Sequence, residues 1–367
     1  MIRCESTKVT RRAGGIFLAG LMCAGLPAGA YEQAHLDQLK RTGACSSCDL
    51  RGASLAGMRL IEANLEGTDL RDADLTGAIM AQARLAGADL RGTRLHGASL
   101  FRADLGGADL RAQSMTGARL SRASLRDALM AESDLSNANL DGADLSGCDL
   151  KGANLAGARL RNATMEGADL AGARLTGVEM TLVDLGGIVS LADADLSGVQ
   201  ARKAVFRDVD MSRTTLAGAE LKAADLSGAV LVDANFRGAL LTKAKFENAN
   251  LAGADFSEAR LKAVRLKGAR LERTQWAGAT LSGTLVDLDL SGLDFHGSNL
   301  GGANLKGARF DGADLRKTNF SKANLYGASF LGADLTDATF KGANLREARL
   351  AGARTAGANF DQARGRD

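Results

Sequence analysis

Two cysteines separated by two serines, Cys45 and Cys48, are the residues of this chain whose type and spacing could most directly do chemistry. Such a pair can form a disulfide, act as a redox site, attach haem or supply two zinc ligands. Haem attachment needs a histidine at position 49, which is Asp49, and zinc needs two further ligands, of which His35 could be one. A redox site needs a helix beside a parallel sheet, which this context does not predict. We therefore expect a disulfide, with redox and zinc sites as the alternatives.

The other histidines and the carboxylates do not predict a catalytic site. His96 and His296 lie 200 residues apart, and the carboxylates recur at one position of a repeat with basic residues beside them. Acid–base catalysis by two carboxylates needs a pocket that shifts the pKa of one of them. No Gly-Lys pair is present for a phosphate-binding loop. We therefore expect no catalytic, cofactor-binding or metal-binding residue, and we expect that the protein is not an enzyme.

A five-residue period organises the segment that follows the cysteines. From Leu50 to Leu185 every fifth residue is Leu or Met, which makes 28 consecutive repeats. The residue two before each centre is nearly always small, the residue between is mostly polar, and glycine is the commonest residue two after the centre, as in residues 143–147 (A-D-L-S-G). Period five fits neither an α-helix nor a simple strand. It predicts short extended segments joined by tight corners, with the centre and the small residue inside.

Units such as residues 143–147 resemble the pentapeptide-repeat family, over about residues 48–360. The resemblance implies an all-β fold, a right-handed quadrilateral β-helix with four repeats per coil. The sequence supports four repeats per coil by itself, because an acidic and a basic column each recur every 20 residues. The columns are Asp49, Asp69, Asp89, Asp109, Asp149 and Asp169, and Arg51, Arg71, Arg91, Arg111 and Lys151. We expect them to form a solvated wall in which opposite charges neutralise each other.

Residues 31–47 predict a cap that carries the C-x-x-C motif, with a short N-terminal capping helix, because an uncovered first coil would invite pairing. The β-helix should then run over residues 48–360 in about sixteen coils, followed by a tail, residues 361–367. The repeat interval gains one residue near 186–190 and loses one near 282–290. We interpret these register slips as bulges or widened corners in one continuous solenoid.

Aromatic residues enter the core of the C-terminal third. Phe310, Phe320, Phe330 and Phe340 alternate with leucine, which predicts stacked rings on two opposite walls. Trp276 is oversized for such a core, and we expect a local distortion there.

Residues 1–30 break the repeat and predict a secretory signal peptide. Four basic residues precede an apolar run from Ala13 to Leu26, and small residues at 28–30 supply a cleavage site before Tyr31. The run of about fourteen residues is shorter than the roughly twenty that span a bilayer. We expect export by the Sec route, with the twin-arginine route as the alternative. The mature protein should then be periplasmic or secreted in a bacterium, without a membrane span.

Charge bears on the choice of partner. Removing residues 1–30 takes away four of the 46 basic and one of the 43 acidic residues, so that equal numbers remain. The best-known members of the resembling family imitate duplex DNA and block type II topoisomerases, which needs a strongly negative surface. We therefore favour an exported, non-enzymatic rod that binds or scaffolds an unknown protein partner. The alternative is a cytosolic DNA-mimicking topoisomerase-binding protein.

Two further expectations concern partners. The densest basic stretch, residues 260–273, should encircle one coil and lacks exposed aromatic residues, so we do not expect nucleic-acid binding. The few residues after Phe360 are too short for a second capping helix, so an end-to-end homodimer through the C-terminal coil is also expected.

Overall fold

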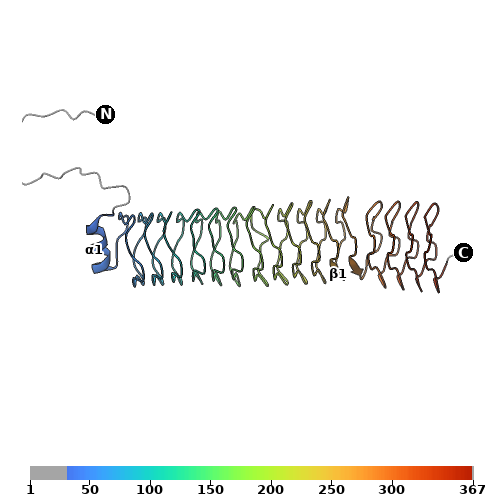
Figure 1. Ribbon diagram of the computed structural model, residues 1–367, viewed down its shortest axis with the longest axis horizontal. Coiled ribbons are helices and arrows are strands. Elements are labelled where there is room, and N and C mark those ends of the chain that lie inside the picture. The colour runs from blue at the N-terminus through green and yellow to red at the C-terminus, as the bar shows by residue number, and fades with distance from the viewer. Residues whose placement is uncertain (1–30, 366–367) are drawn as a thin grey trace, which may run out of the picture.

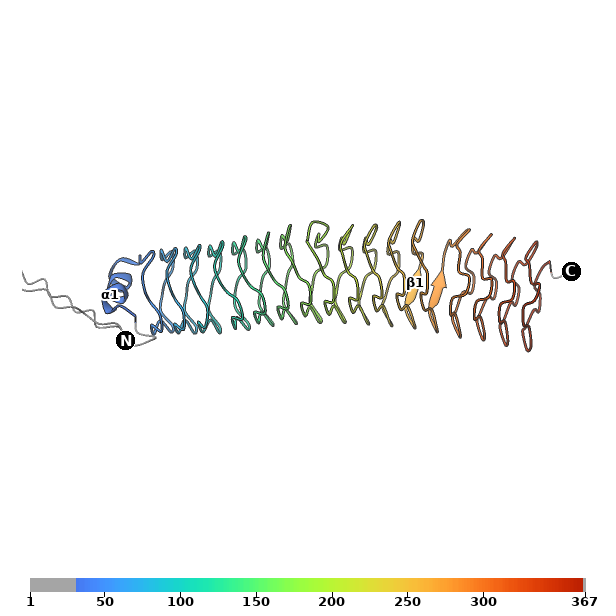
Figure 2. The same ribbon diagram turned by 90° about the horizontal axis from the view of Figure 1, so that it is seen from above.

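The computed structural model describes residues 31–365 as one elongated stack of coils (Figures 1 and 2). A helix, α1 (Gln33–Thr42), lies at the N-terminal end of the stack. The predicted signal peptide, residues 1–30, lies outside the described residues, as do residues 366–367 of the predicted tail. Between residues 31 and 365, α1 included, no helix has the length and apolar character that crossing a membrane requires.

Most β pairing in the stack joins single residues in parallel to the residue 20 positions further on. Asp49 pairs with Asp69, and the neighbouring amide of Leu50 donates to the Asp69 carbonyl at 2.8 Å. Among the described residues only β1 (Arg260–Lys262) and β2 (Thr280–Ser282) extend over three residues, and they pair in parallel. The four repeats of one coil therefore form four narrow walls. A period of five and a pairing interval of 20 are two views of this arrangement.

Each repeat turns at a corner whose second residue usually has a positive φ, the left-handed backbone conformation. Gly92 has φ +73°, and Asp72, at the same position one coil earlier, has φ +59°. Glycine adopts this conformation without a steric penalty, and Asp is among the residues that tolerate it best. The corners inferred from the frequent glycines are present, and other residues occupy many of them.

The centres and the small residues line a continuous apolar core. In the C-terminal third, Phe310 stacks on Phe330 with ring centroids 5.2 Å apart, and Phe320 stacks on Phe340 at 5.0 Å. Rings on adjacent walls meet edge to face, so both arrangements fill the axis. Trp276 is fully buried and stacks on an aromatic ring of each neighbouring coil. The ring is therefore accommodated, and the irregular backbone begins after it.

The pairing interval changes at two places. It is 21 residues from Asp169 to Ser190 and returns to 20 afterwards. It falls to 19 residues from Gln275 to Asp294 and returns to 20 from Thr284 onward. Coils continue on both sides of each slip, and only the local contacts between coils differ.

Candidate functional site

The segment around α1 places the predicted disulfide beside the first coil. In the structure Cys45 and Cys48 form a disulfide and both are buried. His35 accepts a hydrogen bond through Nδ1 from the Asp49 amide at 3.0 Å, and its Nε2 lies 3.4 Å from the Glu32 carboxylate. In later coils the equivalent amide donates to the coil before it, so His35 takes the place of a preceding coil. In the disulfide state the two cysteines offer no thiolate to a metal.

The other residues considered for chemistry lie apart from one another. His96 is exposed, and His296 is half-buried with an Nδ1 atom that lacks a hydrogen-bond partner. Cys148 is a free thiol in the core, and burial raises its pKa to about 12, so that it stays protonated at neutral pH. Within residues 31–365 no three His, Cys, Asp or Glu side chains gather closely enough to hold a metal ion.

The acidic and basic columns meet on one wall as expected. Arg71 lies 2.6 Å from Asp69 in its own coil and 3.5 Å from Asp89 in the next. Arg51 and Arg91 repeat both contacts. The hydrogen bond from Arg91 holds the pKa of the Asp89 carboxyl below its usual range, so the wall stays ionised at neutral pH. Because each charge is already paired along the rod, this wall has little net field to attract a charged partner.

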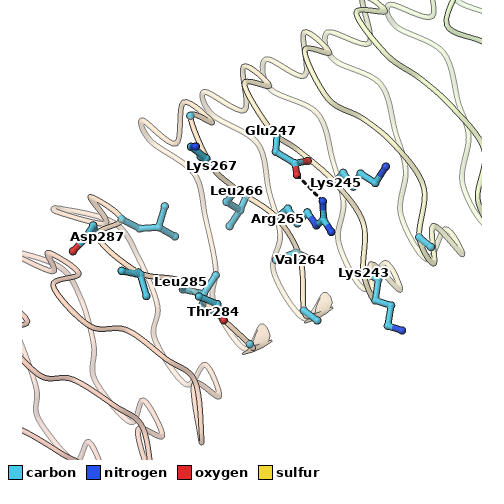
Figure 3. A pocket seen from close by; sticks show the side chains of 16 residues that line it. Lys243, Lys245, Glu247, Val264, Arg265, Leu266, Lys267, Thr284, Leu285 and Asp287 are labelled. Atoms are coloured by element: carbon cyan, nitrogen blue, oxygen red, sulfur yellow. Dashed lines mark hydrogen bonds and ion pairs between the residues drawn. The ribbon is translucent and has the colours of Figure 1, made fainter.

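A cleft with a volume of about 1120 Å³ opens on a different wall, at the second slip (Figure 3). We call it the second-slip cleft. Its edges are residues 263–268 in one coil and residues 283–288 in the next. Figure 3 shows Leu266 and Leu285 between these two edges and Lys243 and Lys267 toward the rim. The cleft is therefore a local separation of two coils that leaves apolar core residues at its base.

The backbone along the two edges lacks the usual pairing. One coil earlier, the amides of Phe246 and Asn248 donate to the next coil at 2.8 and 2.9 Å. The corresponding amides of Leu266 and Gly268 donate to nothing within the described residues, and no bridge joins Arg265 to the next coil. The coils rejoin at Trp276, whose amide donates to the Asp294 carbonyl at 2.8 Å. Two parallel strand edges thus face each other unpaired across the cleft.

The missing residue explains this opening. The centres Leu281 and Leu285 are four residues apart, so the segment after the corner lacks one residue. Gly283 at that corner has φ +114°, unlike the values near +65° at regular corners such as Gly278. A β-carbon on Gly283 would lie 2.9 Å from Cα of Ala263, so glycine is required both for conformation and for space.

Basic side chains surround the second-slip cleft. Four basic residues and two acidic residues line it, namely Lys243, Lys245, Arg265, Lys267, Glu247 and Asp287. Lys245 contacts Asp225 at 3.0 Å, and Arg265 contacts Glu247 at 3.5 Å. Lys243 and Lys267 form no ion pair with any residue that the structure describes. The rim therefore carries a net positive charge, with two lysines available to a ligand.

A smaller opening, of about 730 Å³, lies on the same wall at the first slip, between Thr164 and Asp184. We call it the first-slip opening. The coils close again at Gly167, whose amide donates to the Gly187 carbonyl at 2.7 Å. Its charged lining residues are two basic and four acidic, namely Arg126, Arg207, Asp144, Glu166, Asp184 and Asp208.

Sequence reasoning placed the second slip within residues 282–290 but did not anticipate the second-slip cleft. It also assigned the basic residues of 260–273 to a belt around one coil, and the structure puts only Arg265 and Lys267 of them on the rim. The one available signal was the coincidence of a shortened repeat with a basic stretch. That coincidence says nothing of which backbone amides lose their partners.

The comparisons with known proteins agree with the repeat. The family model described as pentapeptide repeats matches overlapping segments that together cover residues 45–112, 114–187 and 190–367. The break at residues 188–189 falls at the first slip. A comparison with curated protein sequences finds no significant match.

Solved structures of pentapeptide-repeat proteins are among the similar chains. HetL, a pentapeptide repeat protein involved in heterocyst differentiation regulation from Nostoc sp. strain PCC 7120, is 26% identical over 72% of this chain and 90% of its own, with a TM-score of 0.23. QnrB1, a plasmid-mediated fluoroquinolone resistance protein, is 21% identical over 53% and 92%, with a TM-score of 0.35. A protein of the Arabidopsis thaliana thylakoid lumen is 30% identical over 32% and 67%, with a TM-score of 0.23. From the repeats matched along most of its length, the chain belongs to the pentapeptide-repeat family.

Proposed function

We propose that the protein is an exported, non-enzymatic rod that binds or scaffolds another protein in the periplasm or outside the cell. The observation that carries the binding role is the outer surface. Bridging residues recur in columns along the rod, and backbone hydrogen bonds hold successive coils in register. Solenoids present such extended, stiff surfaces to protein partners. A pre-ordered surface loses little conformational freedom on binding, which favours recognition of a partner over a large area.

Two observations support export. Residues 1–30 have the order of basic, apolar and small residues that is typical of a signal peptide. The Cys45–Cys48 disulfide beside the first coil fits an oxidising compartment, because thiols stay reduced in the cytosol. N-terminal sequencing of the protein from its native host tests this. The proposal expects the mature chain to begin at or near Tyr31.

An intact N-terminus would overturn export. Inhibition of DNA supercoiling by a type II topoisomerase would then support the alternative, a cytosolic DNA mimic. The binding role is tested by chemical cross-linking in the compartment where the protein is found, followed by mass spectrometry. Cross-links from the rod to one recurring protein are expected, and cross-links only to itself would count against a separate partner.

We also propose the finer architecture that the family resemblance implies. It is a right-handed quadrilateral β-helix of about sixteen coils, with α1 as the N-terminal cap and the C-terminal coil as the contact of an end-to-end homodimer. The dimer is supported by the centre Leu350, which is partly exposed, whereas Leu345 is fully buried. Sedimentation velocity should give twice the mass of the chain, and Leu350→Glu should give the single mass.

A further inference from the structure

We propose that the second-slip cleft binds an extended peptide segment of a partner protein, and that this segment adds a β-strand between two coils and carries a carboxylate. This inference rests on the proposed function, that the rod binds proteins, and it names where and how the rod would do so. Three features of the cleft lead to it: the unpaired backbone, the alternation of side chains, and the charge of the rim.

The unpaired backbone calls for a strand. An exposed strand edge presents rows of amides and carbonyls that readily pair with another chain. Here the amides of Leu266 and Gly268 face the opposite edge of residues 284–286 without reaching it. A strand inserted in parallel register could accept hydrogen bonds from the first edge and donate to the second. Recognition by strand addition takes its affinity from such main-chain bonds, and its specificity comes from alternate side chains.

The side chains of the two edges say which residues the inserted strand should carry. Val264, Leu266 and Leu285 are almost fully buried, and they form the apolar base of the cleft. Alternate residues of the inserted strand would meet this base, so small or aliphatic side chains fit there. The residue between them would point outward and stand between Arg265 and Thr284, in the column that continues from Lys245. A carboxylate at that position would face an arginine across a strand pair, which is a favourable arrangement.

The rim favours the same charge. Lys267 lies on the edge of the cleft, Lys243 lies one coil away, and neither has an ion-pair partner within residues 31–365. Arg265 has a carboxylate at 3.5 Å, a longer contact than the 2.5 Å of Arg207 with Asp225. An acidic segment therefore gains electrostatic attraction without first breaking a short ion pair. Basic peptides would meet four like charges.

The first-slip opening serves as an internal comparison. It interrupts the backbone pairing only at Thr164, and acidic residues predominate among its charged lining residues. An acidic peptide should not bind there.

The test uses the full mature protein and a fluorescent peptide. The probe is the capped nonapeptide S-G-A-D-L-S-G-A-S, which offers one aspartate between small and aliphatic residues. Fluorescence anisotropy should show saturable binding. The same peptide with lysine in place of aspartate should bind at least tenfold more weakly. Binding of both peptides with equal affinity, or of neither, would overturn the proposal, and so would binding of single-stranded DNA at this cleft in preference to the probe.

Two variants of the rod locate the binding. Lys243→Glu with Lys267→Glu should weaken the probe at least tenfold, whereas the matched control Lys322→Glu with Lys341→Glu, of equal net charge, should not. Insertion of one alanine between Gly283 and Thr284 restores the five-residue interval and should abolish probe binding. Circular dichroism and solution scattering of this variant should match the wild type. Unchanged probe binding by the closed rod would overturn the proposal.

Failure of the cleft and failure of the proposed function are distinguishable. A partner that cross-links to the rod equally well after the alanine insertion would leave the binding role intact and overturn this site. If no partner cross-links to the wild-type rod, the proposed function itself fails, whatever the probe does.

Discussion

The two register slips differ in sign, and the rod responds to them differently. At the first slip an added residue is taken up at the corner, where Val189 points into solvent with 60% of its side chain exposed and Ile188 stays buried. The coils separate at Thr164 only. At the second slip a residue is missing, and two successive walls lose their backbone pairing between residues 264 and 273. An extra residue can bulge outward, whereas a missing residue pulls the following segment away from its neighbour.

The comparison teaches that a solenoid hides insertions and displays deletions. Coils are held by nearest-neighbour contacts, so a local fault need not spread along the rod. Aromatic stacking on an intact wall bridges the second slip, because Trp276 contacts Phe256 at 4.4 Å and Phe295 at 5.7 Å between ring centroids. The cleft can therefore open on one side while the other side stays closed.

The largest expected effect tests that bridge. Trp276→Ala removes a fully buried ring and leaves a cavity beside the open walls, so we expect a loss of about 3–5 kcal/mol in the free energy of unfolding. Chemical denaturation followed by circular dichroism measures it. The control, Leu182→Ala, alters a side chain that is 69% exposed near the first slip and should change stability by less than about 0.5 kcal/mol. Equal effects for the two variants would contradict the bridging role.

The glycines of the two slips should differ next. Gly283→Ala forces a side chain into a φ of +114° and against Cα of Ala263, so it should cost about 1–3 kcal/mol. Gly187→Ala places its β-carbon 3.2 Å from Cγ of Glu166, a side chain that can move, and the change should stay within about 0.5 kcal/mol. Thermal denaturation of both variants decides the matter. A larger loss for Gly187→Ala would reverse our view of which corner is strained.

A third prediction compares buried carboxylates near the two openings. Burial of Asp225 opposes ionisation, but hydrogen bonds from Arg207, Ser227 and Lys245 outweigh it and hold its pKa below the ordinary value of 3.8. Because the pKa is lower in the folded state, the stabilisation is present above pH 3.8 and is lost as pH falls through the folded value. Asp225→Ala should destabilise the rod by about 1–3 kcal/mol at pH 7.

The difference between wild type and Asp225→Ala should shrink when unfolding is measured at progressively lower pH. Asp144, at the first-slip opening, behaves alike, since hydrogen bonds from Ser146 and Arg126 outweigh burial and lower its pKa to about 2. Asp144→Ala should show the same direction of pH dependence. A difference that grew on acidification would contradict the assigned direction for either residue.

The smallest effect is expected at an exposed ion pair near the first slip. Arg161 contacts Glu179 at 2.5 Å, and both side chains are solvent-exposed. Such pairs contribute about 0–1 kcal/mol and are screened by salt. Arg161→Ala should therefore change the unfolding free energy by less than about 1 kcal/mol, and the change should diminish in concentrated salt. A larger loss that salt does not reduce would show that this wall depends on its ion pairs.

Most of the fold could be predicted because each repeat contains its own instructions. The inward positions of residues 143–147 are apolar, its corner carries glycine, and 20-residue columns such as Asp69 and Asp89 show which repeats lie above one another. The two slips were also visible, as intervals of six and four residues between centres. Even the oversized Trp276 could be located, although the predicted distortion lies after it rather than at it.

The second-slip cleft could not be predicted in the same way. A shortened interval shows that the register changes, but the backbone can absorb that change at a corner, within a wall or by separating two coils. Packing between coils decides among these, because the amides of Leu266 and Gly268 lose their partners only if residues 284–286 move away. The sequence by itself determined the repeat, its register and its core. Only the tertiary structure decided where the stack opens, since that depends on contacts between residues 20 apart and not on any residue alone.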